Sequence, residues 1–161
     1  LDFYSNADIE RIIDRSARIL NITIEPGAVK RLAASSRFTP RVANRLLKRS
    51  RDYAEVRGTG IITDAIAAST LSLLDIDEAG LEPMDRRILE VIATKFGGGP
   101  VGIQSLAAAS NEEEDTIEEV YEPYLMQLGL IERTPRGRMV TELAYKHLGI
   151  ASRIQQKPLI S

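Results

Sequence analysis

The sequence predicts a mainly α-helical protein of two small units, four short helices followed by a winged helix with a small β-hairpin wing. Apolar residues recur at helical spacing along most of the chain. An acidic stretch that contains Gly80 and Pro83 breaks this spacing, which favours a connector, and two strand-like runs flank a turn at Pro135-Arg136-Gly137. We therefore expect a first unit at residues 1–75, a linker at 76–83, a second unit at 84–150 and a mobile tail at 151–161.

The four helices of the first unit are each marked by a capping residue or a proline at the start. Ser5, with an acid three residues later, is typical of a helix N-terminus. Pro26 suits a first helical turn, and Thr39 places a cap before Pro40 at the first helical position. Thr63 caps the last helix. The expected helices cover residues 6–20, 26–35, 40–56 and 64–74.

The second unit is expected to contain three helices, a hairpin and a closing helix. The first helix ends at Gly97-Gly98-Gly99-Pro100, which we interpret as a plain interhelical turn. Asn111, a residue favoured at helix N-termini, is predicted to cap the third helix, and Gly129 ends it. The expected helices cover residues 84–96, 103–109, 113–128 and 142–148, and the strands cover residues 130–133 and 138–141.

Composition excludes several classes of site. No apolar run approaches the roughly 18 residues that a membrane-spanning helix needs, and no signal pattern precedes the first helix, so we expect a soluble, cytoplasmic protein. The chain has no cysteine, which excludes disulfides and thiolate metal sites. Its one histidine, His147, cannot form a histidine cluster and is expected on the surface, so we predict no metal site. No Gly-rich phosphate-binding loop is present.

Charge is divided unevenly along the chain. Residues 1–75 hold 12 Lys and Arg against 9 Asp and Glu, whereas residues 76–161 hold 9 against 14. Segment 37–57 concentrates seven basic residues against two acidic ones. Arg41 falls in a first helical turn, where the helix dipole disfavours a cation, so it is a candidate to meet an anion such as a nucleotide phosphate. A solvated arginine-rich helix face is the alternative.

The second basic cluster surrounds the hairpin turn. Arg133, Arg136 and Arg138 are candidates for contact with a DNA backbone. The preceding helix, which a winged helix offers to a DNA groove, carries three glutamates between residues 118 and 122, and we expect these to repel phosphates. DNA contact is therefore assigned to the wing and expected to be indifferent to sequence. The alternative is an ordinary hairpin whose arginines maintain solubility.

Five segments, in order and with matching spacing, resemble the signatures of the bacterial RuvB family over residues 1 to about 150. They are Phe3-Tyr4, Thr39-Pro40-Arg41-Val42-Ala43-Asn44-Arg45-Leu46-Leu47, Gly98-Gly99-Pro100-Val101-Gly102, Glu122-Pro123-Tyr124-Leu125 and Arg133-Thr134-Pro135-Arg136-Gly137-Arg138. The resemblance implies a small AAA+ lid domain followed by the winged-helix head domain of a hexameric motor. With the RuvA junction-binding protein, that motor drives branch migration of Holliday junctions by ATP hydrolysis.

The resemblance also implies roles for individual residues. The nucleotide-binding positions are Tyr4, Pro40 and Arg41, of which Arg41 is the catalytic sensor of the γ-phosphate. The DNA-touching positions are Arg133 and Arg138, with Arg136 as a helper between them. Two positions depart from the family pattern. Phe38 stands where relatives often have glycine, and Glu114 stands where some relatives have a basic DNA contact.

The resemblance further implies a cofactor and partners. The cofactor is ATP or ADP with Mg²⁺ in the full-length protein, and none is expected in this chain by itself. The partners are DNA, RuvA, further copies of the chain in a homohexamer and the RuvC resolvase. Because Leu1 is not methionine and begins inside a family signature, we expect a piece of a longer motor, unable to hydrolyse ATP without the P-loop domain.

Two other functions stay open on sequence alone. A sequence-specific winged-helix regulator or origin-binding protein would read bases with residues 113–128 and use residues 1–75 as a helical adaptor. A winged helix that binds protein would suit the negative charge balance of residues 76–161.

Overall fold

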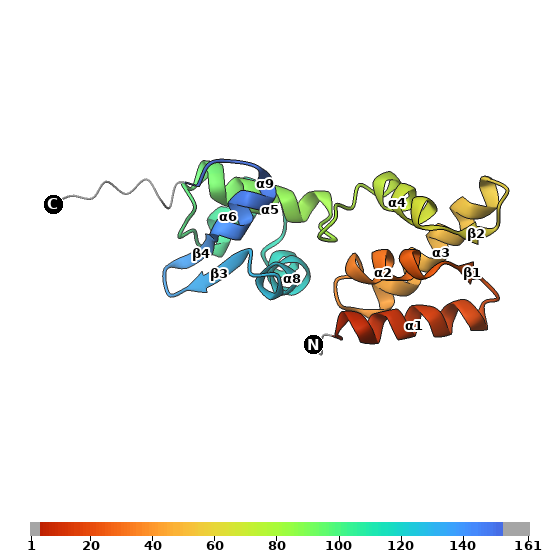
Figure 1. The fold of residues 1–161 in the computed structure, drawn as a ribbon. Coiled ribbons are helices and arrows are strands. Elements are labelled where there is room, and N and C mark those ends of the chain that lie inside the picture. Colours follow the sequence, from red (N-terminus) through yellow and green to blue (C-terminus); the bar gives the residue numbers. More distant parts are fainter. Residues whose placement is uncertain (1–3, 153–161) are drawn as a thin grey trace. The chain divides into compact units, whose positions relative to one another are not determined.

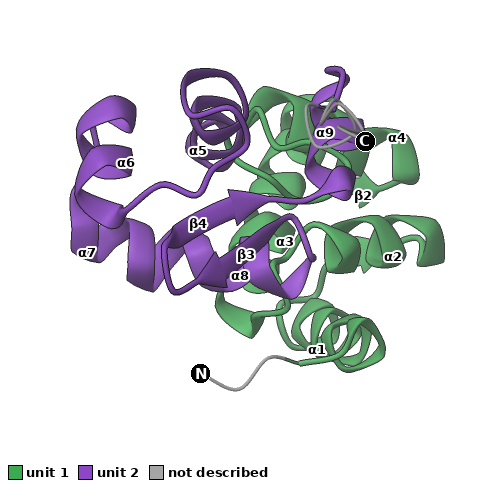
Figure 2. Ribbon diagram, turned by 90° about the vertical axis from the view of Figure 1, so that its left-hand side faces the viewer, with its two compact units in different colours: residues 1–82 green, residues 83–161 purple. Residues whose placement is uncertain are grey.

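The computed structural model describes residues 4–152, while residues 1–3 and 153–161 lie outside the described part (Figure 1). The chain forms two compact units, residues 1–82 and 83–161 (Figure 2). Of the expected tail, residues 153–161 therefore lie outside the described residues. Within residues 4–152, no helix combines the length and the apolar character needed to cross a membrane.

The part of the first unit that the structure describes contains the four predicted helices and a pair of two-residue strands (Figure 1). The elements are α1 (Asn6–Ile19), β1 (Thr23–Ile24), α2 (Pro26–Ala34), α3 (Pro40–Val56), β2 (Ile61–Ile62) and α4 (Asp64–Leu73). The expected caps are confirmed, because Ser5, Thr39 and Thr63 each accept a backbone N–H three residues later. Strands β1 and β2 pair in parallel, which the sequence did not predict.

The helices of the first unit share one apolar core. Its largest fully buried side chains come from three helices and β2: Ile9, Ile13, Leu32, Leu46, Leu47 and Ile62. Ile76 packs against the same core, and the Asp77 carboxylate accepts the backbone N–H groups of Ala79 and Leu81. Residues 76–82 of the expected linker therefore pack with the first unit, because this turn and the apolar contact of Ile76 hold them there.

The second unit has the predicted winged-helix plan of helices followed by a hairpin and a closing helix (Figure 1). Its elements are α5 (Pro83–Lys95), α6 (Ile103–Ser110), α7 (Glu114–Thr116), the π-helix η1 (Ile117–Tyr121), α8 (Glu122–Gln127), β3 (Ile131–Thr134), β4 (Gly137–Val140) and α9 (Glu142–Leu148). The fold class predicted from the sequence is confirmed. The antiparallel pairing of β3 with β4 forms the wing.

The helix expected at residues 113–128 is not one regular helix. Its middle turn is widened into η1, in which the Glu122 N–H donates to the Ile117 carbonyl five residues back. Pro123 follows, and a proline has no N–H to donate and crowds the carbonyl four residues before it. The proline therefore explains why the regular hydrogen bonding is interrupted here.

The prediction that Asn111 caps this helix was wrong. Asn111 lies at the C-terminal end of α6 in the left-handed region, with a φ of 57°, and its N–H donates to the Ala107 carbonyl. Asparagine is favoured both at helix N-termini and in the left-handed conformation that ends a helix. The residue type therefore indicated a helix boundary at residue 111, but it did not indicate whether Asn111 ends α6 or begins the next helix.

The glycine-rich turn after α5 packs directly against the wing. Val101 donates to and accepts from the Arg138 backbone at 3.0 and 2.8 Å, which adds a third short segment beside β4. Gly99 has a φ of 99°, and a Cβ there would collide with the Arg138 carbonyl. Gly137 has a φ of 135°, and a Cβ there would collide with the Val101 carbonyl. The glycines allow this close approach, which fixes the base of the wing.

Candidate functional site

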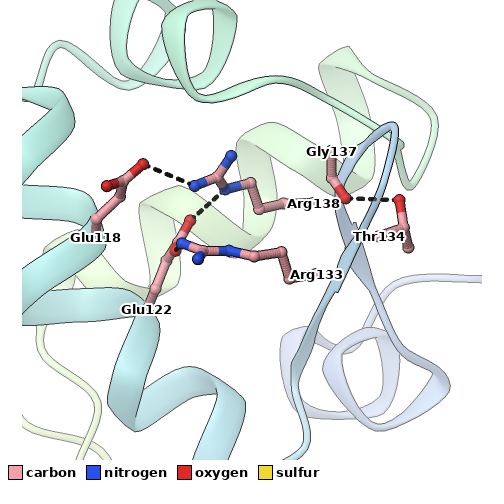
Figure 3. Close-up of polar contacts among 6 residues, drawn as sticks. All are labelled: Glu118, Glu122, Arg133, Thr134, Gly137 and Arg138. Atoms are coloured by element: carbon pink, nitrogen blue, oxygen red, sulfur yellow. Dashed lines mark hydrogen bonds and ion pairs between the residues drawn. The ribbon is translucent and has the colours of Figure 1, made fainter.

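The wing brings two of the three candidate arginines onto one face. Arg133 on β3 stands directly opposite Arg138 on β4, so both side chains project to the same side of the hairpin (Figure 3). The turn between the strands is closed by Thr134, whose hydroxyl donates to the Gly137 carbonyl at 2.8 Å. Arg136 lies in that turn and is exposed.

Both paired arginines contact one buried carboxylate (Figure 3). Glu122, at the start of α8, has a side chain only 1% exposed, and its two oxygens accept from Arg138 Nε at 2.6 Å and from an Arg133 terminal nitrogen at 2.7 Å. Arg138 also donates to Glu118 of η1 at 2.9 Å. Two guanidinium groups and two carboxylates therefore form one neutral cluster.

The two paired arginines differ in their access to solvent. The Arg138 side chain is 10% exposed and has two carboxylate partners, whereas the Arg133 side chain is 49% exposed. Burial would lower the pKa of Arg138, but hydrogen bonding and the charges of Glu122 and Glu118 outweigh it, so the pKa is raised. Arg138 therefore stays charged and is held inside the unit.

This arrangement changes the electrostatic interpretation of the glutamates. From the sequence we expected the glutamates to repel phosphates and all three wing arginines to be available for contact with DNA. In the structure, Glu118 and Glu122 are neutralised by Arg133 and Arg138. Sequence reasoning missed these two glutamates as partners of the wing. Their spacing, one helical turn apart just before an arginine-rich hairpin, was the available signal.

The candidate nucleotide residues lie around the start of α3. The Tyr4 backbone N–H donates to the Phe38 carbonyl at 3.1 Å, which ties the start of the described chain to the segment before α3. Pro40 is the first residue of α3, and the exposed Arg41 follows it in a helical turn that contains no acidic residue. Phe38 has a φ of 55°, a region that glycine adopts readily and bulky residues rarely do.

The other residues considered from the sequence are the glycine-rich turn, His147 and Glu114, and the fold accounts for the position of each. Gly97-Gly98-Gly99-Pro100 forms the turn described above, and His147 lies exposed on α9. Glu114 is exposed in the first turn of α7, where the helix dipole favours an acid. Within residues 4–152, no three His, Cys, Asp or Glu side chains are grouped so that they could hold a metal ion.

Comparison with known proteins identifies both units. The family model of the RuvB AAA lid domain matches residues 4–77, and that of the RuvB C-terminal winged helix domain matches residues 78–149. The chain belongs to the RuvB family. The subunit RuvB of the Holliday junction branch migration complex from Dehalococcoides mccartyi (strain CBDB1) is 56% identical over 150 residues, which are 93% of this chain and 43% of that protein.

Solved RuvB structures give the same result. The Thermotoga maritima RuvB Holliday junction branch migration motor superposes with a TM-score of 0.90 at 48% identity, over 94% of this chain and 51% of that one. A mutant form of the same RuvB superposes with a TM-score of 0.91 at 48% identity, over 94% of this chain and 50% of that one. The chain thus spans about half the length of the RuvB proteins that it matches.

Proposed function

We propose that this chain serves as the lid and the DNA-contacting head of a RuvB-type motor that uses ATP to drive branch migration of Holliday junctions. The observation that carries the proposal is the match of both units, in order, to RuvB domains, together with an exposed arginine at the tip of the wing. The motor would act as a homohexamer in the bacterial cytoplasm, with RuvA at the junction and RuvC as the resolvase that follows.

The DNA contact is assigned to the sugar-phosphate backbone. Arg136 is exposed and Arg133 is half-exposed, so their guanidinium groups are accessible to phosphate oxygens. Neither η1 nor the first turn of α8 contains a basic residue that would read bases. Binding should therefore depend on salt and discriminate little between sequences.

A titration of labelled junction DNA at two salt concentrations tests this contact. Arg136→Ala should weaken binding several-fold and reduce the slope of log affinity against log salt by about 0.9, because one phosphate contact is lost. Lys146→Ala removes the same charge from an exposed position on α9 and serves as the matched control. Equal losses in the two variants, or strong preference for one unrelated duplex over another, would contradict the assignment.

The nucleotide role is assigned to Tyr4, Pro40 and Arg41. The exposed ring of Tyr4 and the ring of Pro40 offer apolar surface to a base, and Arg41 offers a cation to the terminal phosphate of ATP. ATP bound with Mg²⁺ would supply the chemical energy, while these residues of the lid would hold the nucleotide and sense its terminal phosphate.

The test of the nucleotide role uses a full-length motor that contains this chain. Arg41→Ala should lower ATP turnover by at least about tenfold, because a positioned cation is lost from the transition state. Lys48→Ala, an exposed cation further along α3, should leave turnover unchanged. Wild-type turnover in Arg41→Ala would remove the sensor role and leave the DNA contact untouched.

A further inference from the structure

We propose that Glu122 is a positioning residue that controls which wing arginines meet DNA: it anchors Arg138 permanently and holds Arg133 until a DNA phosphate takes its place. The proposal rests on the backbone contact assigned to the wing above. It concerns a residue that need not touch DNA itself.

Arg138 is built as the fixed partner of this pair. Its guanidinium is bound by two carboxylates, at 2.6 Å from Glu122 and 2.9 Å from Glu118, and its side chain is 10% exposed. Its backbone N–H and carbonyl are both bonded to Val101. Moving the Arg138 side chain outward would break both carboxylate contacts and leave the buried Glu122 with Arg133 as its one remaining cation partner in the cluster, which is costly.

Arg133 is built as the exchangeable partner. One terminal nitrogen donates to Glu122 at 2.7 Å, while 49% of the side chain faces solvent. A guanidinium carries five N–H donors, so a phosphate oxygen can bind an open donor before the bond to Glu122 is given up. Glu122 then still accepts from Arg138, so its buried charge is never left alone.

Glu122 itself cannot follow Arg133 outward. Its side chain is 1% exposed, and its backbone lies where the Glu122 N–H closes η1 and Pro123 begins the next turn. The carboxylate is therefore a fixed point against which Arg133 moves. The DNA-free wing presents the exposed Arg136 together with the half-exposed Arg133 still bonded to Glu122, and in the bound wing both arginines donate to phosphate.

The exchange predicts that a neutral residue at position 122 tightens DNA binding. Glu122→Gln keeps the shape of the side chain and removes the charge that competes with phosphate for Arg133. We expect junction DNA to bind the 161-residue chain about three- to tenfold more tightly at low salt, with a salt slope steeper by up to about 0.9. Glu119→Gln removes the same charge from an exposed position in η1, and its gain should be less than half as large.

A double-mutant cycle tests whether the effect passes through Arg133. The gain from Glu122→Gln should disappear when Arg133→Ala is also present, because no released arginine remains. Calorimetric melting of each variant checks that the second unit is folded. Unchanged or weaker binding by a folded Glu122→Gln variant, or the same gain without Arg133, would overturn the proposal.

A second measurement needs no variant at position 122. The guanidinium NMR signals of Arg133 should shift when junction DNA is added to the unaltered chain, while those of Arg138 stay in place. Equal shifts for both arginines would also overturn the proposal. If instead Arg136→Ala and Arg133→Ala both leave DNA binding unchanged, the backbone contact itself fails, which is a distinguishable outcome.

Discussion

Replacing Arg138 by alanine should destabilise the second unit far more than replacing Arg136. The Arg138 side chain is 10% exposed and joins two carboxylates, so its loss leaves Glu122 buried with Arg133 as its one remaining cation partner in the cluster. Breaking a buried ion pair costs about 3–5 kcal/mol when the remaining charge has no partner. Because Arg133 still neutralises Glu122, we expect about 2–3 kcal/mol for Arg138→Ala.

The matched variant is Arg136→Ala, which removes the same side chain from an exposed turn. Exposed substitutions usually change stability by less than about 0.5 kcal/mol. For a unit of this size, each kcal/mol lowers the melting temperature by about 4–8 °C. Calorimetry should therefore show the transition of the second unit about 10–20 °C lower in Arg138→Ala and almost unchanged in Arg136→Ala.

The DNA titration completes the comparison. Below the melting transition of each variant, Arg136→Ala should lower affinity through the loss of an exposed cation. Arg138→Ala should act mainly on stability. The reasoning would be refuted if Arg138→Ala had the melting temperature of the unaltered chain and bound DNA as weakly as Arg136→Ala. Arg138 would then be a direct DNA contact and not a buried anchor.

Two further predictions concern the wing's base and the first unit. Gly99→Ala should destabilise the second unit by at least about 2 kcal/mol more than Gly97→Ala. Both glycines have a positive φ, but only a Cβ at position 99 would collide with the Arg138 carbonyl. Equal losses of unfolding free energy in urea for the two variants would contradict the collision. Hydrogen bonding to Arg31 lowers the pKa of Asp64, so this pair should stabilise the first unit above the unfolded aspartate pKa of about 3.9 and lose that contribution as pH falls through the lower folded pKa. Asp64→Asn should flatten that part of the pH dependence of unfolding, and an unchanged profile would contradict the assignment.

The helix starts of the first unit were the most predictable part of the fold, because they depend on a few neighbouring residues. Thr39 and Thr63 cap the helices that the sequence assigned to them. The pairing of β1 with β2 was not predictable, because two residues show no periodicity and their partners lie 38 positions apart, as for Thr23 and Ile61. Local signals thus identified the helices and left out the parallel strand pair between them.

The candidate site was predictable by residue type more than by role. Arginines at a hairpin turn indicated a polyanion contact, and Arg136 is exposed there. The burial of Arg138 depends on Glu122, which lies 16 residues earlier and was interpreted from the sequence as a separate acidic helix. The number of charges along the sequence does not show which of them the fold brings together, and the pairing of Arg138 with Glu122 depends on the fold.

This pairing has a consequence for how a RuvB-type head would hold DNA. Three free arginines would give a salt slope of about 2.7, whereas the exposed Arg136 contributes about 0.9 and Arg133 adds a similar amount only after it leaves Glu122. One wing should therefore bind weakly and release easily. Several wings linked in a ring would bind tightly together, because each further contact becomes intramolecular. In the proposed ring, weak contacts of this kind would let one wing release DNA while the other wings hold it.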